Sequence, residues 1–157
     1  MLRTMVLIIG LGLISLVLLV LGIEFAEKRN IRNMVPKLIK IDSTYRVAFE
    51  GSFDESYGFG LYKLDETISI EIQKQGLVFF KKIKQGKKSK WPYETWELSR
   101  GKADFSWIES SRVRGYTGFQ TKFDNSLTYE IYSSRTWFHG KIVIIPELRL
   151  VNVYFSG

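Results

Sequence analysis

A run of lysines between aromatic residues is the strongest chemical signal in this sequence. The segment FFKKIKQGKKSKWPY, residues 79–93, carries six lysines within ten positions that hold no acid, namely Lys81, Lys82, Lys84, Lys87, Lys88 and Lys90. The formal net charge of the chain is +7, so everything outside these lysines sums to about +1. The basic character therefore belongs to one segment, here called the Lys81–Lys90 cluster, and not to the whole surface.

Three interpretations of the Lys81–Lys90 cluster stay open. Each lysine near an anionic lipid surface contributes about 1 kcal/mol, and the adjacent Trp91 is of a type that settles at membrane interfaces. Lysines with aromatics also bind nucleic acid, but the segment has no arginine, the residue best suited to bidentate phosphate contacts. The third interpretation is a solvated basic loop. We take the six lysines and Trp91 as a candidate site for lipid or an acidic partner, and expect no nucleic acid.

Metal binding and nucleophilic catalysis have little support. His139 is the only histidine and the chain has no cysteine, so the ligand spacings of the usual zinc sites are missing. The lack of cysteine also excludes disulfides and thiolate nucleophiles. We therefore predict no catalytic residue, no metal site and no cofactor. His139 is expected to lie in a loop or at a strand end and to make one hydrogen bond.

Two pairs of carboxylates near tryptophans are the feature that most favours an enzyme. Acids beside aromatic residues suit glycan hydrolysis, which needs a defined separation between two carboxyl groups. Proximity in sequence does not give that separation, and acids that neutralise nearby lysines are far commoner. The pairs are Asp104 with Glu109 and Glu94 with Glu97, near Trp107, Trp91 and Trp96.

Two pairs of glycines do not match a phosphate-binding loop. Gly58 and Gly60 lie inside a strand pattern, and the segment Gly115–Gly118 is followed by no helix pattern, whereas a phosphate loop joins a strand to a helix. We predict instead that the backbone or a large aromatic side chain passes close to these glycines.

The N-terminal segment Met5–Ile23 is predicted to hold the rest of the chain in a membrane. It has 19 residues without a charge, and 14 of them are Leu, Ile or Val. As a helix it spans about 28 Å, close to the ~30 Å hydrocarbon core of a bilayer. The competing interpretation is a cleaved signal peptide. However, the apolar stretch exceeds the usual 7–15 residues, and no small-x-small cleavage site comes after it.

The side of the membrane that carries the domain stays open. Basic residues after the span outnumber Arg3 and the amino terminus before it, which favours a cytoplasmic domain. A short basic head before an apolar helix is, in contrast, typical of signal anchors, which export the domain that they carry. We favour the extracytoplasmic side.

The remaining residues suffice for one domain. We divide the chain into a transmembrane anchor at 1–23, a juxtamembrane connector at 24–40 in which Pro36 ends any helix, and a β-rich globular domain at 41–157. The predicted class is α+β: a single N-terminal transmembrane helix, then a mainly antiparallel sheet of six to eight strands with one packed helix.

Alternating apolar residues define the predicted strands. The segment Asp65–Lys84 fits either a helix with Asp65 as its N-cap or two strands that turn at Lys74–Gly76, and the helix is preferred because lysines crowd its end. Gln85–Arg100 is predicted to be a loop. The strands are expected near residues 45–50, 57–64, 105–113, 116–123, 127–133, 141–145 and 148–155.

These observations predict a single-pass, non-enzymatic protein of the cell envelope. Its domain is expected to bind another envelope protein, as a subunit, an accessory factor or an anchored inhibitor of the immunity type. Two alternatives remain: a membrane-tethered hydrolase of envelope glycan or lipid, and a module that binds anionic lipid through the Lys81–Lys90 cluster. The oligomeric state stays open.

Overall fold

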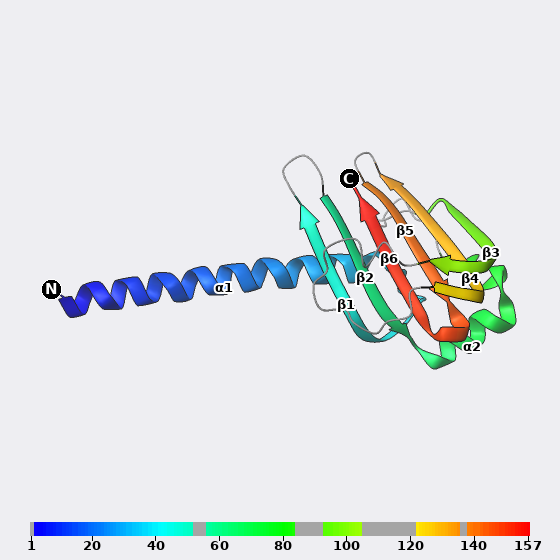
Figure 1. The fold of residues 1–157 in the computed structure, drawn as a ribbon, viewed down its shortest axis with the longest axis horizontal. Coiled ribbons are helices and arrows are strands. Elements are labelled where there is room, and N and C mark those ends of the chain that lie inside the picture. The colour runs from blue at the N-terminus through cyan, green and yellow to red at the C-terminus, as the bar shows by residue number, and fades with distance from the viewer. Residues whose placement is uncertain (1, 52–55, 84–92, 105–121, 136–137) are drawn as a thin grey trace.

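A long helix leads into a domain built on one antiparallel sheet (Figure 1). The computed structural model describes residues 2–51, 56–83, 93–104, 122–135 and 138–157. The strand order is β1-β2-β6-β5-β4-β3, and all neighbours are antiparallel. The predicted α+β class is confirmed. The elements are α1 (Leu2–Met34), β1 (Ile41–Gly51), β2 (Ser56–Leu64), α2 (Glu66–Gln75), α3 (Leu77–Phe80), β3 (Thr95–Asp104), β4 (Lys122–Arg135), β5 (Phe138–Ile145), the 3-10 helix η1 (Pro146–Leu148) and β6 (Leu150–Ser156).

Helix α1 carries a stretch of exposed apolar side chains and ends inside the core of the domain. The large apolar side chains between Ile9 and Ile23 are exposed, whereas Ile31 and Met34 have only 1% and 5% of their surface exposed. The helix ends before Pro36, as predicted, because a proline disfavours helical geometry at the residue that precedes it. The later part of segment 24–40 thus packs with the sheet, since Ile39 is buried as well.

One face of the sheet forms the main core beneath the end of α1, α2 and α3. Side chains on that face come from alternate positions of each strand, as the pleat of a β-strand requires. Phe80 of α3 packs against Tyr129 of β4, with ring centroids 4.7 Å apart. The buried core residues on the strands are Tyr62, Leu64, Tyr129, Ile131, Ile142, Ile144, Val151, Val153 and Phe155.

Two glycines of β2 leave room for large side chains, as predicted. A Cβ atom on Gly58 would lie 2.6 Å from a ring carbon of Phe155 and 3.2 Å from Ile31 Cδ1. A Cβ atom on Gly60 would lie 2.5 Å from the ring of Tyr62. The corresponding prediction for Gly115–Gly118 lies outside the described residues.

The segment after β2 is helical, so the two-strand alternative is wrong. The carboxylate of Asp65 accepts a hydrogen bond from the backbone N–H of Ile68 at 3.1 Å, which is the predicted N-cap. Gly76, at φ +56°, ends α2, and α3 follows at once. Ile72 and Phe79 lie on the buried side.

The predicted loop at Gln85–Arg100 is wrong over its last part. Thr95–Arg100 belongs to β3, which pairs with β4 from Thr95 opposite Tyr132. The apolar alternation that marks a strand is weak here because β3 is the last strand in the sheet order, and both Glu97 and Leu98 are exposed. The strand predicted at 105–113 and most of that at 116–123 lie outside the described residues.

Candidate functional site

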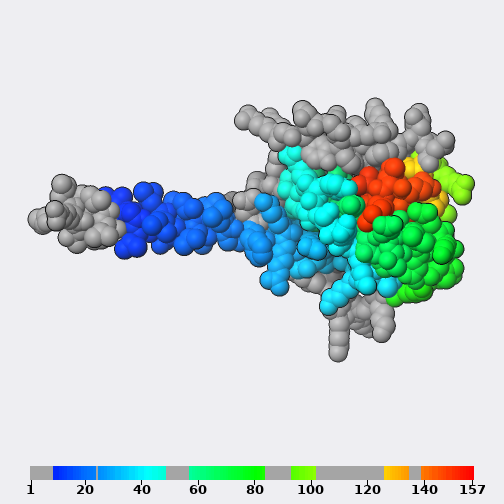
Figure 2. Space-filling view, turned by 90° about the horizontal axis from the view of Figure 1, so that it is seen from below, coloured from blue at the N-terminus to red at the C-terminus, as the bar shows by residue number. Residues whose placement is uncertain are grey.

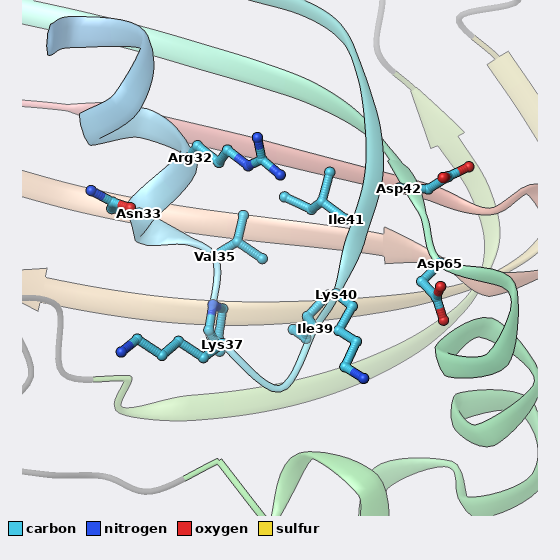
Figure 3. Close-up of a pocket in the computed structure, with 10 residues that line it drawn as sticks. Arg32, Asn33, Val35, Lys37, Ile39, Lys40, Ile41, Asp42 and Asp65 are labelled. Carbon is cyan, nitrogen blue, oxygen red and sulfur yellow. The ribbon is translucent and has the colours of Figure 1, made fainter.

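An open groove lies where the chain leaves α1 and enters the sheet (Figure 3). Its volume is about 760 Å³. Three elements contribute to it: the last turn of α1, the connector after that turn, and the first residues of β1, with the N-cap of α2 at one end. The lining residues are Arg32, Asn33, Val35, Pro36, Lys37, Ile39, Lys40, Ile41, Asp42 and Asp65.

Backbone hydrogen bonds hold in place the connector that forms one wall of the groove. The N–H of Ile39 donates to the carbonyl of Pro36 at 2.8 Å, which makes a tight turn directly after the helix. The N–H of Asp65 donates to the carbonyl of Lys40 at 3.0 Å, which joins the connector to the start of α2. Ile39 is buried, so this turn is held by the core on its inner side and exposes Lys37 on its outer side.

The two acidic residues of the groove already interact with other groups of the domain. Asp42 is 3.4 Å from Lys63 Nζ and 3.5 Å from an Arg149 guanidinium nitrogen. Asp65 caps α2. The two acids are therefore already used within the domain.

Among the described residues, the groove cations Arg32, Lys37 and Lys40 have no such partner. In the part of the chain that the structure describes, no carboxylate lies within salt-bridge distance of Arg32, Lys37 or Lys40. All three side chains are exposed. The groove thus offers unmatched positive charge to an anionic group.

Two members of the Lys81–Lys90 cluster can be placed. Lys82 forms an ion pair with Glu71 at 3.0 Å, and its ammonium lies 5.7 Å from the centre of the Phe79 ring. The hydrogen bond from Lys82, together with one from Gln75, lowers the pKa of Glu71 below its usual value. Lys81 is exposed. Lys84, Lys87, Lys88, Lys90 and Trp91 lie outside the described residues.

His139 lies near a strand end and makes a hydrogen bond, as predicted. It is the second residue of β5, and its Nδ1 lies 2.8 Å from the hydroxyl of Tyr132 on the neighbouring strand. Among the residues that the structure describes, no group of three or more His, Cys, Asp or Glu side chains is arranged to hold a metal ion.

Of the two predicted pairs of carboxylates near tryptophans, the structure describes Glu94 and Glu97, and it does not bring these two together. Glu94 accepts a hydrogen bond from the hydroxyl of Ser134, while Glu97 lies three positions further along the same extended chain. Side chains three positions apart in a strand point to opposite faces, so these two carboxyl groups do not face one substrate. The Asp104 side chain and the whole of Glu109 lie outside the described part.

Sequence reasoning missed the groove, although its cations were visible. Arg32, Lys37 and Lys40 counted only toward the orientation of the membrane span. The available signal was their position on both sides of Pro36, because the helix must end there and the chain must turn.

Comparison with known proteins gives no relative. No protein-family model, curated protein or solved structure matches this chain. A function must therefore be inferred from the chain's own residues.

Proposed function

We propose that this protein is a single-pass membrane protein of the cell envelope whose sheet domain binds another protein and does not catalyse a reaction. The observation that carries the proposal is the exposed apolar length of α1. Its most apolar 18-residue window has a mean hydropathy of 2.4, and none of that window is buried against the domain. Each Leu, Ile or Val left in water forgoes about 1.5–3 kcal/mol of burial free energy. A bilayer is the environment that removes this cost.

The continuity of α1 supports a domain held at a set height above the membrane. The helix runs without interruption from Ile23 to Met34, about 16 Å at 1.5 Å per residue. Ile31 and Met34 are buried in the domain core, so no flexible linker separates the span from the sheet. A continuous helical connection of this kind suits a subunit, accessory factor or anchored inhibitor whose partner lies in the same membrane.

Exposed apolar side chains far from the proposed membrane support a protein-binding role. Ile70, Leu77, Val78 and Leu148 are 45%, 39%, 58% and 42% exposed. They belong to α2, α3 and η1, and the two longer of these helices lie at the opposite end of the molecule from the start of α1 (Figure 2). The three elements adjoin, since α2 contacts both α3 and η1, and exposed apolar side chains on adjoining elements are candidates for protein contact. We call these four side chains the distal patch.

The test is site-specific crosslinking in native membranes. A photoreactive amino acid, p-benzoyl-phenylalanine, replaces Val78 in the distal patch, or Ser99 on β3 as an exposed control. The proposal predicts one discrete protein adduct from position 78 and a weaker or different pattern from position 99. Recovery of the chain alone in mild detergent, together with no protein adduct from position 78, would contradict a binding role.

A reporter fusion tests on which side of the membrane the domain lies. We propose the extracytoplasmic side. A reporter fused after Gly157, active only outside the cytoplasm, is then expected to be active, whereas activity only of a cytoplasmic reporter would reverse the assignment.

A further inference from the structure

We propose that the groove between α1 and β1 binds an acidic, extended segment of the partner protein. This inference rests on the proposed function, because it names a second contact of the same binding domain. It is independent of the distal patch, which lies on other elements.

Charge is the first argument. Arg32, Lys37 and Lys40 are exposed cations with no salt-bridge partner among the described residues, and they line one groove. Asp42 is occupied by Lys63 and Arg149. Lys40 also acts electrostatically on Glu71, but at more than salt-bridge distance. An acidic ligand therefore meets three positive charges without first breaking a salt bridge to a described residue.

Height above the membrane favours a protein over a lipid headgroup. Arg32 lies nine residues beyond Ile23, which is about 14 Å along the helix. The headgroup layer on one side of a bilayer is only about 5–8 Å thick. The groove thus begins beyond the layer that holds the lipid phosphates of the same membrane. A neighbouring protein that extends above the membrane can reach it.

The form of the groove favours an extended segment. The groove is open to solvent, and β1 is the first strand in the sheet order, so one wall comes from a strand with a single partner strand there. The pairing of β1 with β2 shifts register between Ile41 and Ser43. A segment laid along an edge strand combines backbone contacts with side-chain contacts, a common mode of peptide recognition.

The test places the photoreactive amino acid at Asn33, an exposed residue of the groove, in the full-length chain in native membranes. The adducts are digested and identified by mass spectrometry. The expected result is a partner peptide with several Asp or Glu residues at the crosslinked site. A phospholipid adduct, a peptide without acidic residues, or no adduct would overturn the proposal.

Matched variants show whether the groove's charge is responsible. The triple change Arg32→Gln, Lys37→Gln and Lys40→Gln is expected to reduce the adduct yield at least tenfold. The control triple carries the same loss of charge on exposed cations outside the groove and outside the Lys81–Lys90 cluster, through Arg29→Gln, Lys74→Gln and Arg100→Gln, and should keep the yield. Equal losses from the two triples would overturn the proposal, since general charge would then explain binding.

Further outcomes test the role of charge and separate the groove inference from the proposed binding function. The charge-keeping triple Arg32→Lys, Lys37→Arg and Lys40→Arg is expected to retain most of the adduct, and its failure to do so would contradict a role for charge. If position 78 gives a protein adduct and position 33 gives none, the groove inference fails and the binding function stands. If neither position gives one, both fail.

Discussion

Ile31 of α1 packs over Gly58 of β2. A Cβ atom at position 58 would lie 3.2 Å from Ile31 Cδ1 and still closer to the ring of Phe155. The helix that carries the exposed apolar segment is thus seated directly on the sheet. This contact holds the end of α1 against the sheet.

Gly58→Ala is expected to destabilise the domain. The added methyl group must displace the buried ring of Phe155 or the end of α1, and overpacking of this kind costs about 1–3 kcal/mol. Urea unfolding in detergent, followed by tryptophan fluorescence, measures the loss. Gly22→Ala is the matched control because nothing lies within 4 Å of the added atom. A stability loss as large at position 22 would argue against this packing.

Ile31→Ala tests whether the end of α1 belongs to the core. Removing a side chain that is 1% exposed is expected to lower the unfolding free energy by about 2–5 kcal/mol. The exposed neighbour Asn33 provides the control, since Asn33→Ala should change the unfolding free energy by less than about 0.5 kcal/mol.

Two fragments of the chain test the same packing. Fragment 24–157 is expected to fold. Fragment 41–157, which lacks Ile31, Met34, Val35 and Ile39, is expected to give a poorly dispersed NMR spectrum. A well-dispersed spectrum of 41–157 would contradict the assignment.

The buried tyrosines predict a loss of stability in alkali. Burial raises the pKa of Tyr62, with Arg32 opposing the shift, and burial likewise raises the pKa of Tyr93. A tyrosine whose pKa is higher in the folded state keeps its proton while the unfolded chain releases it above pH ~10. Its contribution is therefore complete below that pH and decreases by about 1.4 kcal/mol per unit as pH rises further.

Tyr62→Phe separates this effect from general alkaline unfolding. Among the residues that the structure describes, the buried Tyr62 hydroxyl has no hydrogen-bond partner, so its removal should raise the unfolding free energy by about 1 kcal/mol at pH 8. Above pH 10 the advantage of the variant should grow. Parallel stability curves for the variant and the wild type across pH 8–12 would show that Tyr62 is not the group responsible.

Asp65→Ala should weaken the start of α2. The change removes the hydrogen bond to the Ile68 N–H and is expected to cost about 1 kcal/mol. Asp65→Asn keeps an oxygen acceptor and should lose much less. Thermal melts of the two variants measure the difference, and equal melting temperatures would mean that the cap adds nothing to stability.

The sequence predicted those elements whose apolar period was strong and local. The hairpin of β1 and β2, the close approach of Tyr62 to Gly60, and the cap at Asp65 all depend on neighbours within a few residues. These features can be read from residue types and spacing, because backbone geometry determines them directly.

Features that depend on tertiary contacts could not be predicted in this way. Edge strand β3 lacks the alternation of a half-buried strand because both of its faces are partly exposed. The burial of Ile31 and Met34 depends on where α1 meets the sheet, which a charged helical segment does not reveal. The groove arises from the same docking, so its cations looked like ordinary flanking charges.

Cysteine labelling at Leu16 tests the membrane-spanning role of α1 most directly. The chain has no cysteine, so Leu16→Cys gives a single reactive site in the middle of the exposed apolar stretch. A hydrophilic maleimide is applied to native membranes, and Asn33→Cys serves as the accessible control once both faces are open. We expect labelling at position 33, none at position 16, and labelling at position 16 of the full 18.3 kDa chain after detergent is added. Equal labelling of both positions in intact membranes, or no labelled full-length chain in detergent, would contradict a span that stays in the lipid.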